Sequence, residues 1–205
     1  MKQTNDFEQK ITDLIEASIA AKQSLLRNAE LLSTVAQVSR TLLRAFKGGN
    51  KALLFGNGGS AADAQHIAAE FVGRFAFERP ALPALALSVN SSCVTAVGND
   101  YGFDRVFSRQ LEALGRTGDV AIGISTSGSS PNVLSALSTA RKMKLRTVAL
   151  TGHSGGNLRN SVDYCICVPA KETPRIQECH ILIGHIISEL VEREMFDEKS
   201  RISGS

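Results

Sequence analysis

The feature of this sequence that most restricts its fold is a series of short apolar runs separated by segments with helical spacing. The apolar runs occupy residues 52–55, 84–89, 119–124, 146–150 and 164–168. Polar residues do not alternate with apolar ones inside these runs, which is typical of strands buried on both faces. Helical spacing fills residues 60–76, 104–114, 131–143 and 174–195. This order predicts βαβ units and an α/β fold with one buried parallel sheet.

Residues 6–46 come before the first strand and also have helical spacing. Apolar residues recur every three or four positions, first at Phe7, Ile11, Leu14, Ile15 and Ile19 and again from Leu31 to Phe46. The pattern predicts one long helical arm or a pair of helices. A pair could pack on the domain, whereas a protruding arm needs a partner chain to cover its apolar stripe. We therefore divide the chain into an arm that we expect to serve oligomerisation (1–50), an α/β domain (51–196) and a frayed polar tail (197–205).

Composition excludes several classes of protein. Hydrophobic residues make up 43% of the chain, which is enough for a core and argues against disorder. There is no apolar run of about 18 residues and no signal-peptide pattern in the first six residues, so we expect a cytoplasmic protein without a membrane span. A net charge of +3 from scattered basic residues and an aromatic content of 5% argue against direct binding of nucleic acid.

The cysteines fit the same expectation. Cys93, Cys165, Cys167 and Cys179 form no CxxC pair, so we expect free thiols in a reducing compartment. Cys165 and Cys167 lie two positions apart in an apolar run, which places them on the same side of a strand. We interpret them as small buried hydrophobic residues.

A glycine-rich segment, Gly56-Asn57-Gly58-Gly59-Ser60, follows the first strand. Its glycines allow backbone N–H groups to approach a ligand, and Ser60 is placed to cap the next helix. The segment matches a relaxed dinucleotide fingerprint, but the second strand ends in Ser88-Val89-Asn90 without the acid that would hold a ribose. We therefore do not expect a nicotinamide cofactor. The lysine of a P-loop is also missing.

A serine-rich segment, Ser125-Thr126-Ser127-Gly128-Ser129-Ser130, follows the third strand and precedes Pro131. Proline suits the first helical turn, so this segment ends at a helix N-terminus. Its hydroxyls and the helix N–H groups predict a phosphate cradle that needs no lysine. A purely structural cap would need one hydroxyl rather than several.

Two helices carry polar residues among apolar neighbours. His66 and Glu70 are four residues apart and share a helix face, and the last helix carries Gln177, His180 and His185. A single histidine in such a helix is more often a satisfied core residue, but two helices together predict a mixed N/O site suited to zinc. Gln177 and His185 lie about 12 Å apart along a helix. They reach one ion only if their side chains converge or if different subunits contribute, and the sequence leaves both possibilities open.

A set of short motifs carries a family resemblance. The motifs are Gly56–Ser60 with Asp63, His66 and Glu70; Gly98-Asn99-Asp100; Ser125–Gly128; Leu150-Thr151-Gly152; and Arg175–Glu178. In this order they resemble the phosphoheptose (sedoheptulose 7-phosphate) isomerase family of the sugar-isomerase (SIS) domain superfamily. The resemblance covers about residues 6–196. One departure is Pro174, which stands where many members have aspartate.

The resemblance implies a flavodoxin-like three-layer sandwich with five parallel strands, and a homotetramer with active sites near its interfaces. It implies an aldose–ketose isomerase that converts sedoheptulose 7-phosphate to D-glycero-D-manno-heptose 7-phosphate, the first step of ADP-heptose synthesis for lipopolysaccharide or other surface glycans. It also implies one zinc ion per subunit. By this resemblance the catalytic residues are Glu70 and His185, and the zinc positions are His66, Glu70, Gln177 and His185. The substrate positions are Asn57, Gly58, Gly59, Ser60, Glu70, Asn99, Asp100, Ser125, Thr126, Ser127, Ser130 and Gln177.

Two other functions remain open. A related branch of the superfamily binds the replication initiator DnaA and needs no catalysis, and a sugar-phosphate sensor would bind without turnover. Both predict a damaged acid/base set. The presence of Glu70 and His185 in this sequence favours the enzyme.

Overall fold

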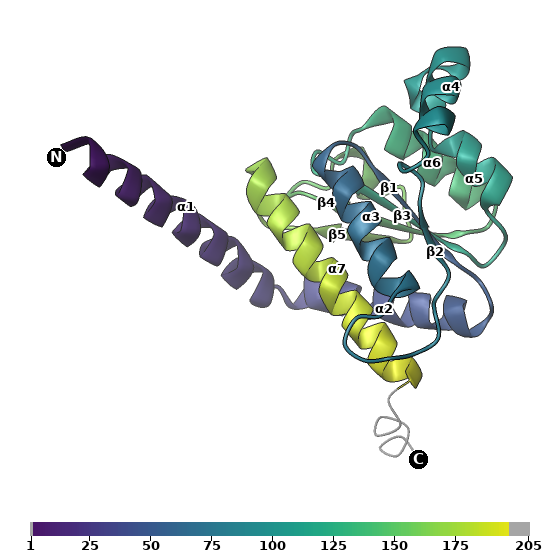
Figure 1. The fold of residues 1–205 in the computed structure, drawn as a ribbon, viewed down its shortest axis with the longest axis horizontal. Helices are drawn as coiled ribbons and strands as arrows, with labels where there is room; N and C mark the ends of the chain where they lie inside the picture. The colour runs from purple at the N-terminus through teal and green to yellow at the C-terminus, as the bar shows by residue number, and fades with distance from the viewer. Residues whose placement is uncertain (1, 197–205) are drawn as a thin grey trace.

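The computed structural model describes residues 2–196 and contains one parallel sheet between two layers of helices (Figure 1). The strands are β1 (Ala52–Gly56), β2 (Ala84–Ala86), β3 (Val120–Ser125), β4 (Arg146–Thr151) and β5 (Tyr164–Cys167). Their order in the sheet is β2-β1-β3-β4-β5, and each neighbouring pair is parallel. This is the flavodoxin-like order, so the predicted fold class is confirmed.

The helices on each face of the sheet pack on a separate apolar core. One face is covered by α2 (Ala29–Lys47), α3 (Gly59–Val72) and α7 (Thr173–Phe196), and the other by α5 (Ser108–Leu114) and α6 (Pro131–Lys142). Neighbouring residues of one strand serve opposite cores: Leu54 joins the first, whereas Leu53 and Phe55 join the second. This is why the strands are mainly apolar on both faces, with polar residues such as Ser125, Thr147 and Thr151 near their ends.

The second strand is shorter than its apolar run predicts, and a helix follows it that the sequence analysis missed. β2 ends at Ala86, and α4 covers Ser91–Tyr101. The side chain of Asn90 accepts a hydrogen bond from the N–H of Cys93 at 3.0 Å, which caps α4. Two further predicted helices differ from the structure. The helix predicted over 60–76 is α3, which ends at Val72, just before Gly73. The helix predicted over 104–114 is a 3-10 turn, η1 (Phe103–Arg105), followed by α5.

The N-terminal region is a pair of helices that behave differently. α1 covers Lys2–Leu26, and α2 begins at Ala29 after Asn28, whose side chain accepts from the N–H of Leu31 at 3.0 Å. α2 packs on the sheet and buries Val38 and Leu42 completely. α1 projects away from the body of the protein as a long arm (Figure 1). Its apolar stripe is exposed, with Phe7 at 68% and Ile11 at 56%.

α3 and α7 lie side by side, and their close contact positions the candidate site (Figure 1). Gly184 makes this contact possible, because a Cβ there would lie 2.6 Å from Ile67 Cδ1. The contacts run in the same order along both helices: Gly59 meets Gln177, His66 meets His185, and Glu192 meets the residues just after α3. The two helices are therefore parallel, and residues widely separated in sequence face each other in fixed register.

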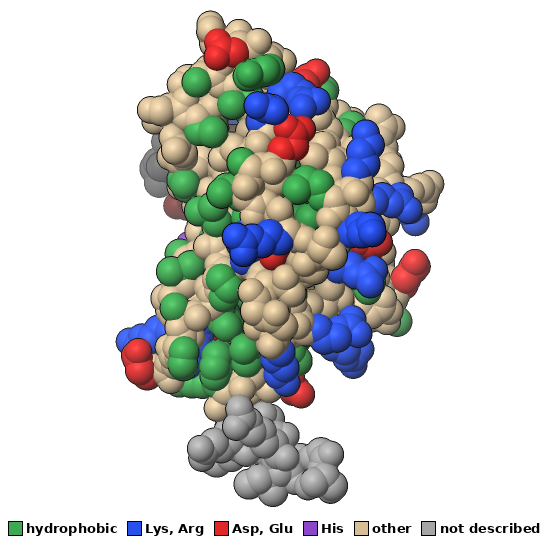
Figure 2. Space-filling model, turned by 90° about the vertical axis from the view of Figure 1, so that its right-hand side faces the viewer, with side chains coloured by type: hydrophobic (Ala, Val, Ile, Leu, Met, Phe, Trp, Pro, Cys, Tyr) green, Lys and Arg blue, Asp and Glu red, His purple; other side chains and the backbone are tan. Residues whose placement is uncertain are grey.

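On the face displayed in Figure 2, basic side chains gather mainly in the right half of the view and apolar ones mainly in the left half, whereas acidic side chains are scattered over the face. Within residues 2–196, no helix is both long enough and apolar enough to cross a lipid bilayer.

Candidate active site

Three of the predicted side chains meet between α3 and α7. The Nε2 atoms of His66 and His185 are 2.9 Å apart, and His66 Nε2 lies 3.1 Å from Glu70 Oε1. One possible ligand atom from each residue lies within 4.8 Å of the others. The helical spacing of His66 and Glu70 supplies one half of the cluster, and the register of α7 supplies the other. The ring of Phe75 lies 5.7 Å from that of His185 and forms an apolar wall on one side.

The donor set of this cluster fits a zinc ion. Two imidazole nitrogens and a carboxylate oxygen are ligands that Zn²⁺ accepts, and three protein ligands leave a position for another group. Nitrogen ligands at about 2.0–2.1 Å on a tetrahedral zinc stand about 3.3 Å apart. The separations of 2.9 Å and 3.1 Å are close to this value. His66, Glu70 and His185 are therefore the residues of one chain that would hold such an ion.

Gln177, the fourth predicted ligand, lies elsewhere in the same chain. Its side-chain amide packs against Gly59, so closely that a Cβ at Gly59 would overlap it. Eight residues separate Gln177 from His185 along α7, a rise of about 12 Å. Within one chain Gln177 belongs to the glycine loop rather than to the cluster. Its role as a metal ligand stays a prediction that requires a contribution from another subunit.

The glycine loop (Gly56–Ser60) connects β1 to α3 and lies at the carboxyl end of the sheet. Gly58 has a φ of +55°, a conformation that favours glycine. Asn57 and Asn132 exchange two hydrogen bonds of 2.9 Å, which tie this loop to the start of α6. Ser60 does not cap α3 as expected: the cap is Gly58, and Ser60 is buried inside the first turn.

The serine loop (Ser125–Ser130) connects β3 to α6 beside the glycine loop. Ser125 Oγ lies 2.9 Å from Ser130 Oγ and 3.4 Å from Ser127 Oγ, so three hydroxyls gather at one place. None of them is spent on an ordinary helix cap, because the Ser130 side chain makes no cap hydrogen bond. A cavity of about 320 Å³ adjoins the loop and is lined by Thr126, Ser127, His153, Ser154, Ala170, Lys171 and Ile176. It offers one cationic side chain, Lys171, that the sequence analysis did not single out.

Asn99 and Asp100 lie at the end of α4 and are exposed. Asn99 Nδ2 donates to Asp100 Oδ1 at 2.8 Å. Among the hydrogen bonds of the described residues, neither side chain is joined to the glycine loop or the serine loop. Their predicted contact with substrate therefore stays a prediction.

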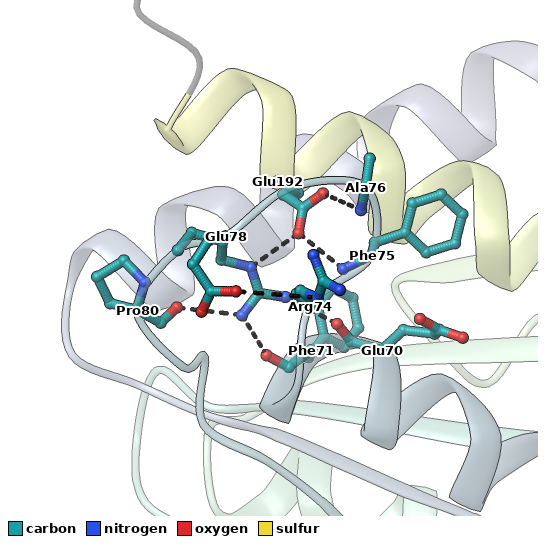
Figure 3. Close-up of polar contacts among 9 residues, drawn as sticks. Glu70, Phe71, Arg74, Phe75, Ala76, Glu78, Pro80 and Glu192 are labelled. Atoms are coloured by element: carbon teal, nitrogen blue, oxygen red, sulfur yellow. Dashed lines mark hydrogen bonds and ion pairs between the residues drawn. The ribbon is translucent and has the colours of Figure 1, made fainter.

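A buried ion pair locks the far end of the α3–α7 contact (Figure 3). Glu192 on α7 accepts hydrogen bonds from the N–H groups of Phe75 and Ala76 and from Arg79 Nε, at 2.8, 2.6 and 2.9 Å. Arg79 in turn donates to the backbone carbonyls of Glu70 and Phe71, at 2.7 Å each. The side chains of Arg79 and Glu192 are 2% and 0% exposed. Sequence reasoning missed this pair, because the two residues are far apart and each resembles an ordinary surface charge.

His180 is a core residue of α7 and takes no part in the cluster. Its Nε2 lies 3.1 Å from the carbonyl oxygen of Thr151 at the end of β4. Burial lowers the pKa of His180 to about 4, only partly opposed by this hydrogen bond.

Asp63 lies about one turn before His66 on α3, and its pKa is shifted in the opposite direction from that of His180. Burial raises the pKa of Asp63 to about 6, and the nearby His66 lowers it less.

The sequence and the fold of this chain were compared with those of known proteins, and the matches belong to one protein family. The model of the SIS domain family matches residues 9–152. The chain is 51% identical to a phosphoheptose isomerase of Sulfurimonas denitrificans over 92% of this chain and 96% of the relative. It is 53% identical to one from Aneurinibacillus thermoaerophilus, over 95% of this chain and 97% of the relative. The solved structure of phosphoheptose isomerase from Neisseria gonorrhoeae superposes with a TM-score of 0.84 and 42% identity, covering 91% of this chain and 98% of that one.

Proposed function

Because this chain belongs to the SIS-domain family and, within it, to the phosphoheptose isomerases, we propose that it interconverts sedoheptulose 7-phosphate and D-glycero-D-manno-heptose 7-phosphate. It is an aldose–ketose isomerase acting on a sugar phosphate. The observation that most strongly supports the proposal is the cluster of His66, Glu70 and His185, whose ligand atoms lie within 4.8 Å of one another. A protein that binds DnaA without catalysis would not need an acid and a base, here His185 and Glu70, held close together.

Glu70 is the proposed base. In the open-chain ketose, it takes a proton from C1, and the electrons form an enediolate across C1 and C2. Return of a proton to C2 gives the aldose. Glu70 suits this role because its carboxylate is partly shielded, with its side chain 21% exposed.

His185 is the proposed acid, moving a proton between the two oxygens of the enediolate. Its ring is held by His66 at 2.9 Å and by the nearby Phe75 ring. A bound zinc ion would supply charge stabilisation for these oxygens, with His66, Glu70 and His185 as ligands. Gln177, from another subunit, is the proposed fourth ligand.

The phosphate is proposed to lie in the serine loop, far from C1. Ser125, Thr126, Ser127 and Ser130 supply hydroxyls, and the N-terminus of α6 supplies N–H groups and a favourable dipole. The glycine loop, with Asn57, Gly58, Gly59 and Ser60, is proposed to contact the sugar, as are Asn99 and Asp100. Holding the phosphate positions the sugar but does no chemistry at C1.

The proposal extends to the setting of the enzyme. We propose a cytoplasmic homotetramer with one zinc ion per subunit, acting in the first step of ADP-heptose synthesis for lipopolysaccharide or another surface glycan. Its partner is the sugar-phosphate substrate, with no direct contact to nucleic acid.

The test is an isomerase assay on sedoheptulose 7-phosphate. We expect turnover by the wild-type protein and a kcat about 10²–10⁴-fold lower for Glu70→Gln, which is the usual contribution of general-base catalysis. Glu78→Gln is the matched control, because Glu78 is an exposed glutamate just beyond the same helix, with its side chain 88% exposed. Chelation should remove activity, and added Zn²⁺ should restore it. Full activity of Glu70→Gln would refute the assignment of the base.

A further inference from the structure

Two thiols lie close together on the edge strand of the sheet, away from the cluster of His66, Glu70 and His185. Cys165 and Cys167 are two residues apart on β5, and their Sγ atoms are 3.6 Å apart. The Thr151 hydroxyl lies 3.5 Å from Cys167 Sγ and 3.6 Å from Cys165 Sγ. The expectation that both residues are buried hydrophobes is wrong. Each is half-buried, and both line a cavity of about 350 Å³ between α2 and the segment 159–167.

The pair shares its protons unequally. The hydrogen bond from Cys165, together with smaller effects of the Thr151 hydroxyl and Arg159, lowers the pKa of Cys167 to about 6 despite the opposing effect of burial. The same hydrogen bond and burial raise the pKa of Cys165 above its usual range. At neutral pH the pair therefore holds one thiolate beside one thiol, and the thiolate is the form that binds metals and electrophiles.

The spacing of the sulfurs matches that of two ligands on one centre. Two thiolates at about 2.3 Å on a tetrahedral zinc stand about 3.8 Å apart, and soft sulfur ligands select thiophilic ions. The two sulfurs, 3.6 Å apart, would therefore need to move only slightly to bind one centre. We propose that Cys165 and Cys167 form a two-sulfur site that chelates a thiophilic metal or metalloid centre, with its remaining coordination positions open to the adjoining cavity.

The site is connected to the serine loop through two glycines. A Cβ at Gly155 would lie only 2.9 Å from Cys167 Sγ, so the Gly155 turn rests directly on this sulfur. On its other side, Gly155 packs so tightly on Gly128 that a Cβ at Gly128 would overlap the Gly155 carbonyl. The N–H of Leu158 also donates to the carbonyl of Gly128 at 3.2 Å. We therefore expect a change at Cys167 to reach the serine loop through the Gly155 turn.

The test uses phenylarsine oxide, whose trivalent arsenic binds two thiols at once. Cys165 gives up its proton, a second proton comes from the solvent because Cys167 is already a thiolate, two As–S bonds form, and the arsenic-bound oxygen leaves as water. Arsenic stays trivalent, so no oxidant or reductant is needed. We expect one adduct per chain by intact-protein mass spectrometry, retained in excess glutathione and removed by dithiothreitol. Absence of a glutathione-resistant adduct would overturn the proposal.

Variants and peptide mapping identify the thiols that bind. Cys165→Ser and Cys167→Ser should each lose the glutathione-resistant adduct, whereas Cys93→Ser, which removes another half-buried thiol, should keep it. In the wild-type protein, the arsenical should protect Cys165 and Cys167 from iodoacetamide but leave Cys93 reactive. This mapping needs no variant, so a folding defect cannot obscure it. Protection of Cys93 instead would also overturn the site.

The connection to the serine loop is tested separately and rests on the proposed function. The arsenical should raise the KM for sedoheptulose 7-phosphate several-fold in the wild type and in Cys93→Ser, and have no effect in Cys167→Ser. An unchanged KM with the adduct in place would refute the connection alone. A protein that binds the arsenical but never isomerises the sugar would refute the proposed function and leave the thiol site intact.

Discussion

The free energy of unfolding depends on pH partly through a single buried residue, His180. Its pKa is about 4 in the folded protein, against about 6.5 in the unfolded chain, so the unfolded state binds more protons between these values. Stability from this group is complete above pH 6.5 and is lost as the pH falls toward 4, by about 3 kcal/mol in total.

His180→Gln keeps an amide donor for the Thr151 carbonyl but cannot titrate. We expect its free energy of unfolding, measured by urea denaturation, to vary much less than that of the wild type between pH 6.5 and 4. Parallel profiles for the two proteins would show that another group causes the acid sensitivity.

Hydroxyls of the serine loop differ in what they contact, and this allows a second prediction for single residues. Ser127 Oγ faces the Ser125 hydroxyl at 3.4 Å, whereas Ser129 Oγ lies 3.5 Å from a backbone carbonyl within the loop. Ser127→Ala should raise KM for the sugar phosphate about tenfold with little change in kcat, because one lost hydrogen bond to a charged group is worth about 1.5–3 kcal/mol. Ser129→Ala, at an equally exposed position, should leave KM near the wild-type value. Equal effects of the two would contradict the proposed cradle.

At the scale of elements, the sequence predicted what depends on local pattern. The apolar runs predicted all strands of the sheet. The spacing of His66 and Glu70 predicted that their side chains lie on the same face of α3. The sequence did not predict the register of α3 against α7, which depends on Gly184 and on buried contacts between distant residues. For the same reason the sequence left open whether Gln177 and His185 of one chain can reach the same ion. The helix α4 was missed because its stretch, Ser91–Tyr101, has no buried apolar face.

The Arg79–Glu192 pair fixes that register, so it should govern both stability and the cluster. Burial alone would raise the pKa of Glu192, but hydrogen bonds from Phe75, Ala76 and Arg79 lower it below its ordinary value. The ionised Glu192 therefore stabilises the folded state above about pH 4.3, and this stabilisation is lost on further acidification. Glu192→Gln leaves the buried guanidinium without its counter-charge and should lower the free energy of unfolding by about 3–5 kcal/mol.

The Arg74–Glu78 pair is the matched control on the same segment (Figure 3). Its atoms are 3.9 Å apart, and its side chains are 63% and 88% exposed. Glu78→Gln should change the free energy of unfolding by less than about 1 kcal/mol. Similar losses in both variants, measured by urea denaturation at pH 7, would contradict a special role for the buried pair.

At the scale of the whole molecule, the arm α1 is the feature that one chain does not explain. Its apolar stripe is exposed, whereas near its end Ala21 and Leu25 are buried against the body. Hydrogen bonds and a salt bridge join the arm to α7 around Leu14, Ser18 and Lys22, through Arg175 and Glu178. A stripe of this kind is stable in water only when another surface covers it. The proposed homotetramer would provide that surface.

Ile11→Gln with Ile15→Gln tests this assembly. Each isoleucine buried at an interface contributes about 1.5–3 kcal/mol, and the loss repeats in every subunit, so we expect the tetramer to dissociate. Thr12→Gln with Glu16→Gln changes two exposed polar positions of the same helix and should leave the tetramer intact. Sedimentation velocity measures the species, and the isomerase assay should show a parallel loss in kcat/KM if the sites lie near interfaces. A wild-type monomer, or an unchanged tetramer in the isoleucine variant, would refute the role of the arm.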